Sequence, residues 1–137
     1  MRTPQANIDI LRHIAKYCEN IEALIQRFGK DAAAFKEDMA YHDAVSMNIL
    51  QIGELANHLS EEYRRLTKEK MPWAAIRAMR NLFAHNYGQM DLAVIWKTAT
   101  EDIPELKKFC EEQIRTSELL QDESLEFDYD DDEDLEI

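Results

Sequence analysis

The chain has 137 residues, of which 45% are apolar, so it is long enough for one domain with one core and too short for two. Only 3 glycines and 3 prolines are present, which is too few for a protein of many strands and turns. The net charge of −12 is unevenly placed: residues 1–116 contain all 16 basic and 17 acidic residues, whereas residues 117–137 contain 11 acidic residues and no basic one. We therefore expect a nearly neutral helical domain at 1–116 and an acidic tail at 117–137 that repels itself and stays disordered.

The sequence has neither an uncharged apolar run of about 18 residues nor a basic and then apolar start, so we expect a cytosolic protein that does not cross a membrane. Cys18 and Cys110 lie far apart and have no close Cys or His neighbour, which predicts buried free thiols rather than a disulfide or a zinc site. His13, His42 and His58 each stand alone on a predicted helix, so no metal site is expected.

Apolar residues at spacings of three and four predict a first helix that begins at Thr3-Pro4, with Thr3 as its cap, and ends at Gly29. Asp31 can cap a short turn that leads into a long second helix. The apolar stripe of this helix comprises Phe35, Met39, Val45, Ile49, Ile52, Ala56 and Leu59. Gly53 within it costs about 1 kcal/mol relative to Ala. Either another backbone packs closely at Gly53 or the helix simply tolerates it.

Further helices are predicted along the second half of the chain. Ser60 reads as the cap of a short helix, and Pro72 marks a break before a helix that starts at Trp73. A last helical segment follows Asp91, and Pro104 inside it predicts either two helices or one kinked helix. The predicted fold class is all-α, an up-and-down bundle of four to five helices.

Three kinds of polar side chain that suit chemistry on phosphates gather near the end of the helix after Pro72, at Arg80, Asn81 and His85. On one helix Asn81 and His85 lie within about 40° of each other, while Arg80 lies about 140° from His85. A second copy of the helix facing the first would gather these groups into one cleft. Arginine binds phosphate oxygens with two donors, and histidine, with a pKa near 6.5, transfers protons, as metal-independent RNA cleavage requires. A carbonyl-capping histidine and a surface arginine would give the same spacing.

The wider pattern is more specific. Besides Arg-Asn-x3-His-x-Tyr at 80–87, the chain contains Ile52-Gly53-Glu54, Pro72-Trp73 and Asp102-Ile103-Pro104. In order and spacing, residues 5–115 resemble HepT-type toxins of the HEPN superfamily. The resemblance implies a HEPN bundle and a metal-independent endoribonuclease without a cofactor, in which each subunit of a homodimer lends its motif to a shared cleft. Arg80 would then bind the scissile phosphate, His85 would act as general base or acid, and Asn81 would orient the phosphate or the histidine.

The resemblance also implies a type VII toxin–antitoxin module. Its partner would be a cognate MntA-like minimal nucleotidyltransferase, an antitoxin that silences the ribonuclease by AMPylation of the tyrosine two positions after the histidine, here Tyr87. An added AMP would occupy the phosphate site and repel RNA. Two alternatives stay open: a non-catalytic HEPN subunit that binds the nucleotidyltransferase or its nucleotide, and a purely structural dimerisation module, which leaves the polar motif unexplained.

Other residues have two interpretations each. Arg77 and Glu54 match the family pattern and could flank the cleft, or could form a Glu-Arg pair that braces two helices. Trp73 and Trp96 could stack on bases or pack in the core. The acidic residues 130–134 could imitate a nucleic-acid strand and dock on the basic face around Arg77 and Arg80, or could only keep the protein in solution.

Overall fold

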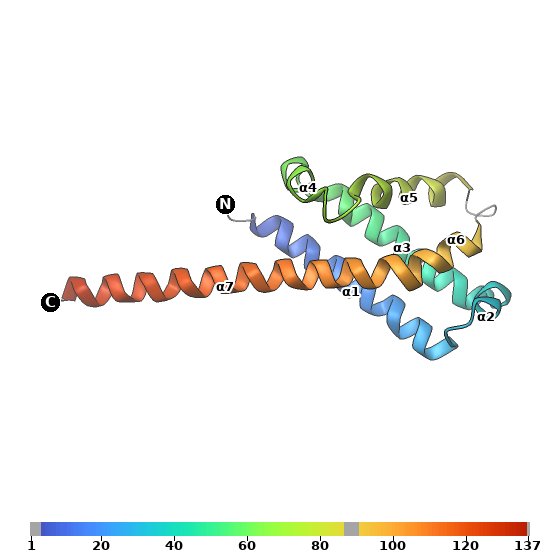
Figure 1. The fold of residues 1–137 in the computed structure, drawn as a ribbon, viewed down its shortest axis with the longest axis horizontal. Coiled ribbons are helices and arrows are strands. Elements are labelled where there is room, and N and C mark those ends of the chain that lie inside the picture. Colours follow the sequence, from blue (N-terminus) through green and yellow to red (C-terminus); the bar gives the residue numbers. More distant parts are fainter. Residues whose placement is uncertain (1–3, 87–90, 137) are drawn as a thin grey trace.

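The structure is a computed structural model that describes residues 4–86 and 91–136, with the side chains of 81–86 and 123–136 left out of the description. Its described residues are helical and form no strand, which confirms the all-α fold class. The long helices α1, α3, α5 and α7 run alternately up and down, and α2, α4 and α6 are short connecting helices (Figure 1). Their bounds are α1 Gln5–Phe28, α2 Ala32–Glu37, α3 Met39–His58, α4 Glu61–Thr67, α5 Trp73–Asn86, α6 Leu92–Lys97 and α7 Ile103–Glu136.

Side-chain caps set the starts of most of these helices. Asp31, Ser60 and Asp91 accept hydrogen bonds from backbone N–H groups two or three residues later, as the sequence predicted. Asp38 does the same for Ala40 and Tyr41, and this cap divides the expected single helix after Asp31 into α2 and α3. Met39, assigned to the apolar stripe of that helix, therefore lies in the first turn of α3 and is 69% exposed.

The start of α1 differs slightly from the prediction. Pro4 occupies the cap position, and the helix begins at Gln5. Gly29 ends α1 with a φ of 103°, a conformation that costs glycine little. The hydroxyl of Tyr41 donates to the carbonyl of Gly29 at 2.9 Å, so the first residues of α3 hold this turn in place.

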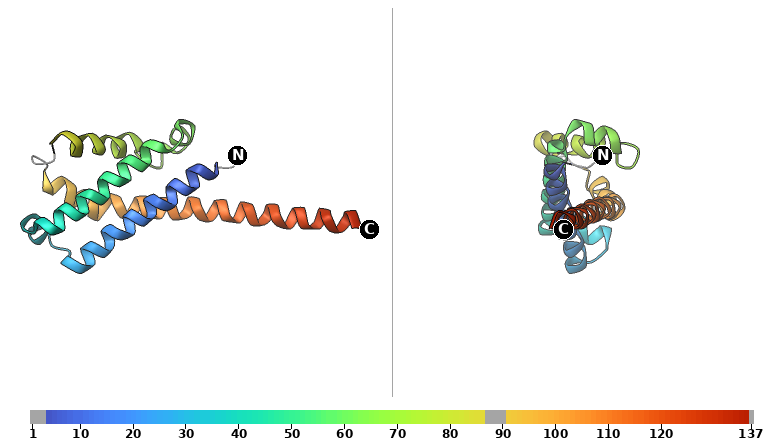
Figure 2. Two further views of the ribbon diagram at one scale, coloured as in Figure 1. Left: turned by 180° about the vertical axis from the view of Figure 1, so that it is seen from behind. Right: turned by 90° about the vertical axis from the view of Figure 1, so that its left-hand side faces the viewer.

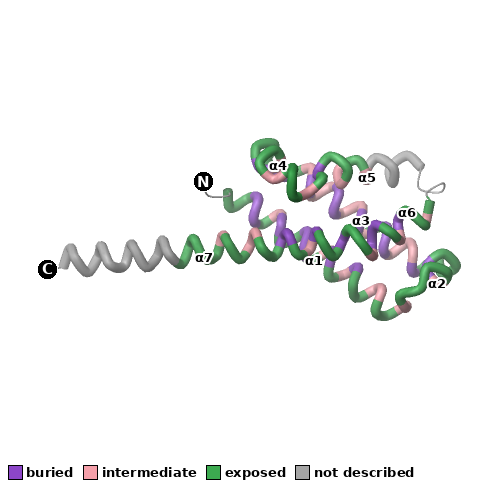
Figure 3. The backbone as a smooth tube through the Cα atoms, viewed as in Figure 1, coloured by how far each residue is buried: buried purple, intermediate pink, exposed green. Residues whose placement is uncertain are grey.

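The core lies where α1 packs against α3 and α7 (Figure 3). Of the residues predicted to face inward from α1, Ile25 and Phe28 are only partly buried, whereas the others are buried: Ile8, Leu11, Ala15, Cys18 and Ile21. The predicted inward residues from Val45 to Leu59 are all buried, which confirms the periodicity there. Cys18 and Cys110 are buried and free, also as predicted. Burial raises the pKa of Cys18 to about 12, and it raises the pKa of Cys110 as well.

The last segment is helical without interruption from α6 through α7, which favours the alternative of one continuous, irregular helix over two separate ones. A π-helical stretch, Thr98–Asp102, joins α6 to α7 with right-handed helical backbone on both sides, and Pro104, which cannot donate a backbone hydrogen bond, lies just after it in the first turn of α7. Within the described residues, no helix has an apolar stretch long enough to cross a membrane.

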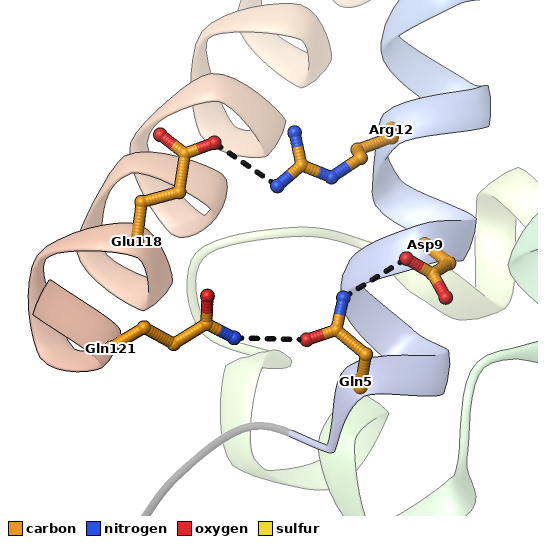
Figure 4. Close-up of polar contacts among 5 residues, drawn as sticks. All are labelled: Gln5, Asp9, Arg12, Glu118 and Gln121. Carbon is orange, nitrogen blue, oxygen red and sulfur yellow. Dashed lines mark hydrogen bonds and ion pairs between the residues drawn. The ribbon is translucent and has the colours of Figure 1, made fainter. Parts of the chain in front are cut away.

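Beyond the core, α7 continues as a single helix past the other elements (Figure 2). Its contacts with α1 extend beyond residue 116, the predicted end of the folded domain (Figure 4). The Arg12 guanidinium lies 3.0 Å from the Glu118 carboxylate, and the Gln121 amide donates to the Gln5 side chain at 3.1 Å. The first turns after residue 116 therefore pack on α1, while the unfolding of the rest of the tail stays a prediction.

Candidate functional site

The helix that carries the polar motif, α5, packs closely against α3 at Gly53. A Cβ atom at Gly53 would lie 3.2 Å from the carbonyl oxygen of Ile76 and 3.4 Å from the backbone nitrogen of Arg80. Even a Cβ there would press on the backbone of α5, so close packing of another backbone, rather than simple tolerance, accounts for the glycine. The same contact places Arg80 beside the residue that follows Gly53.

Arg80 forms an ion pair with Glu54. Its Nε atom lies 3.6 Å from Oε1 of Glu54, and the two side chains are 32% and 44% exposed. Glu54 therefore does brace two helices, but with Arg80 as its partner and not with Arg77. The reason is the register of the helix pair: α3 and α5 are antiparallel, so residue 54 lies opposite residue 80 and residue 57 lies opposite residue 77.

Two further arginines are held by α3. Nε of Arg77 donates to the Asn57 side chain at 3.1 Å. Nη1 of Arg64 donates to the carbonyl oxygens of Ala56, Asn57 and Leu59, at 3.3, 3.1 and 2.6 Å, and so satisfies groups that the end of a helix leaves without partners. Burial, followed by the nearby charge of Arg77, lowers the pKa of Arg64. We call Arg80, Arg77 and Arg64 the arginine row.

The remaining motif residues fall largely outside the description. The backbone of α5 extends to Asn86, so positions 81 and 85 lie in its last turns, as predicted. The side chains of Asn81 and His85 are outside the described set, and Tyr87 lies outside the described residues. Arg80 is therefore the one predicted catalytic residue whose side chain the structure places.

The two tryptophans lie in the core or against it. Trp73 is 3% exposed, its indole N–H donates to the Thr67 hydroxyl at 2.8 Å, and its ring packs edge-on against Phe109. Trp96 packs against Phe35 with ring centroids 5.0 Å apart. The core interpretation is confirmed for Trp73, whereas Trp96 is only partly buried and packs against the core.

The described residues contain no cluster of three or more His, Cys, Asp or Glu that could hold a metal ion. The ring nitrogens of two of the lone histidines have local partners instead. Nδ1 of His13 lies 2.8 Å from the carbonyl oxygen of Asp9, and Nδ1 of His42 lies 3.1 Å from the carboxylate of Asp43.

An open groove of about 640 Å³ lies between α4 and the start of α5, and two members of the arginine row line it. Four basic side chains line it, those of Arg64, Arg65, Lys68 and Arg77, together with a single carboxylate, Glu61. We call it the basic groove. The basic groove was not among the predicted sites, although the closely spaced basic residues from 64 to 70 were a signal for it.

A smaller cavity of about 170 Å³ lies between α3, α5 and α7. Its walls are mainly apolar and include Ile49, Ile52, Ile76, Met79 and Leu106. The described walls include Lys70 but neither an arginine nor a histidine, so Arg80 does not line this cavity.

Residues 14–113 match the family described as HepT-like, Ribonuclease HepT-like. The chain is 33% identical over 124 residues to a protein of Caldanaerobacter subterraneus subsp. tengcongensis named "Putative RNase", an alignment that covers 90% of this chain and 99% of that protein. It is 35% identical over 101 residues to the "Probable ribonuclease HepT" of Thermococcus cleftensis, which covers 72% of this chain and 87% of the relative. No solved structure matches the chain significantly.

The family match spans the elements just described, from the middle of α1 to the middle of α7, and includes both Gly53-Glu54 and Arg80. Fold, motif and relatives agree, and the chain belongs to the ribonuclease HepT-like family of the HEPN superfamily.

Proposed function

We propose that this protein is a cytosolic, metal-independent endoribonuclease toxin of a type VII toxin–antitoxin module. Its composite site forms at a homodimer interface from Arg80, Asn81 and His85, and AMPylation of Tyr87 by a cognate MntA-like nucleotidyltransferase neutralises it. The observation that carries the proposal is the position of Arg80: the guanidinium is held at the surface of α5 by a weak ion pair, within the motif of a ribonuclease family.

The weakness of that pair suits phosphate binding. At 3.6 Å and partly exposed, the contact between Arg80 and Glu54 belongs to a class that contributes about 0–1 kcal/mol. A phosphate that binds two guanidinium N–H groups side by side forms a stronger, charge-assisted contact. RNA can therefore displace the carboxylate of Glu54, which in the free protein keeps Arg80 positioned.

Each group then has one task in the reaction. His85 accepts the proton of the 2′-hydroxyl, the 2′-oxygen forms a bond to phosphorus, and the bond from phosphorus to the 5′-oxygen breaks. The leaving 5′-oxygen takes up a proton from a protonated imidazole or from water. Arg80 stabilises the negative charge that develops on the phosphate oxygens.

The packing of α5 supports a dimeric site. Among the described residues α5 packs mainly on α3, and Ala74, Ala75 and Ala78 are exposed. Small exposed side chains let a second α5 approach closely, which would bring two motifs to one cleft.

Cleavage of RNA by Arg80→Ala and His85→Ala variants tests the proposal. Loss of one transition-state donor lowers the rate by about 10²- to 10³-fold, and loss of a general base by about 10²- to 10⁴-fold. Arg115→Ala, which removes an exposed arginine on α7, is the matched control and should cleave like the wild type. Light scattering should find every variant in the same dimer. Undiminished cleavage by purified His85→Ala would remove the mechanism.

The partner is tested separately by the intact mass of the protein produced with and without the nucleotidyltransferase. Each AMP adds a fixed mass, and Tyr87→Phe should abolish the addition. A wild-type protein that cuts no RNA, yet forms a stable complex with the nucleotidyltransferase, would instead identify a non-catalytic HEPN subunit.

A further inference from the structure

We propose that the basic groove binds the backbone phosphates of the RNA strand that flanks the cleavage site, an inference that rests on the proposed function. The groove is formed by Arg64, Arg65, Lys68 and Arg77, from α4 and α5. Arg80, the proposed contact to the scissile phosphate, lies outside it on the same helix.

The arginine row connects the two places. Arg77 precedes Arg80 by one helical turn, about 4.5 Å along the axis of α5. It is fixed to Asn57, and Arg64 is fixed to the last carbonyls of α3, so both side chains are ordered before any ligand arrives. A strand held at Arg80 thus meets Arg77 next and then the rest of the groove.

The groove and the position of Arg80 differ in whether their positive charges have carboxylate partners. In the described structure Arg80 has a carboxylate partner, whereas Arg77 and Arg64 are held by neutral oxygens. Arg65 and Lys68 form no ion pair with any described residue, and Glu61 is the one carboxylate in the lining. Burial and then the charge of Arg77 lower the pKa of Arg64, against the smaller opposing effect of the Glu61 carboxylate. Like charges held together favour the binding of an anion between them.

The shape of the groove favours a chain of phosphates over a single small anion. It is open, spans α4 and the start of α5, and takes basic residues from both helices. The groove is a locally positive region on a chain whose net charge is −12. Its positive charge attracts a polyanion to this part of the surface. Nonspecific contacts to backbone phosphates are the usual source of affinity for single-stranded RNA.

RNA binding by the full chain tests this inference, with a His85→Ala background so that the RNA stays intact. The test variant is Arg65→Gln/Lys68→Gln, and the matched control is Lys30→Gln/Lys36→Gln, which removes two exposed lysines beside α2, at the other end of the bundle. Loss of two phosphate contacts should make the fall of log affinity with log salt less steep, by about 1.4 in the slope. This change corresponds to about 25-fold weaker binding at 0.1 M salt. The control should bind like the parent protein.

Cleavage assays keep the two proposals separable. With the catalytic residues intact, Arg65→Gln/Lys68→Gln should cut a dinucleotide like the wild type and lose efficiency only on a long RNA. Absence of cleavage by the wild type, with binding still dependent on the groove, would sink the proposed function and leave the groove as an RNA site. Parent-like affinity and salt slope in the groove variant would overturn this inference. A groove variant that binds RNA normally but no longer binds a synthetic peptide of residues 117–137 would also overturn it, because the acidic tail would then be the occupant of the groove.

Discussion

Filling the contact between α3 and α5 should destabilise the protein by an amount that depends on the size of the new side chain. Gly53→Ala and Gly53→Leu place one and four carbon atoms where α5 already touches α3. The nearest atoms are the carbonyl oxygen of Ile76, 3.2 Å from the new Cβ, and the backbone nitrogen of Arg80, at 3.4 Å. Both are main-chain atoms, so neither can turn aside as the end of a flexible side chain could.

Two opposing effects set the magnitude. Replacing glycine by alanine inside a helix contributes about 1 kcal/mol of stability, because glycine loses more backbone entropy on folding. Overpacking costs about 1–3 kcal/mol. For Gly53→Ala the balance is a loss of up to about 2 kcal/mol, since the backbone must shift by only a few tenths of an ångström. For Gly53→Leu the helices must separate, so we expect a loss of about 3 kcal/mol or more.

Urea denaturation followed by circular dichroism measures these losses as changes in the free energy of unfolding. Ala40→Leu is the control, because it also adds a leucine to α3 but on an exposed position. It should change stability by no more than about 0.5 kcal/mol. A Gly53→Leu protein as stable as the wild type would refute the reasoning, because it would mean that α5 does not rest on α3 at this point.

Three further predictions concern the same bundle. Arg64→Met should lower the free energy of unfolding by about 2 kcal/mol, because the last carbonyls of α3 lose a charged donor. Arg64→Lys should restore part of the lost stability. Equal stability of both variants and the wild type would contradict this role of Arg64. Asn7→Ala should cost a similar amount, about 2 kcal/mol, because Asn7 exchanges two hydrogen bonds with Ser60, at 3.0 and 2.9 Å, while it is only 3% exposed. Stability should also fall above pH 9, since the unfolded chain releases the thiol protons of Cys18 and Cys110 near pKa 9.0 while the folded chain retains them. The fall should be about 1.4 kcal/mol per thiol for each further pH unit, and Cys18→Ala/Cys110→Ala should remove that part of it.

Much of the fold could be predicted because its signals are local. Asp31, Ser60 and Asp91 cap helices through N–H groups two or three residues away, so their effect needs no tertiary contact. The spacing of apolar residues predicts which face of a helix is buried, because a helix of 3.6 residues per turn has only one face toward the core. The break at Asp38 was missed although it too is a local cap, because the apolar pattern continues across it.

The candidate site was only partly predictable. Its residue types, Arg80 above all, could be recognised from the motif, since the chemistry of phosphate transfer limits which side chains serve it. The partner of Glu54 could not, because it depends on how α3 and α5 are aligned, and a shift of one turn would have paired Glu54 with Arg77. The basic groove has the same origin: Arg64, Arg65 and Lys68 meet Arg77 only because α4 folds back beside α5. Local sequence thus determined the helices and the motif, whereas the packing of one helix on another decided which charges are paired and which remain open to a ligand.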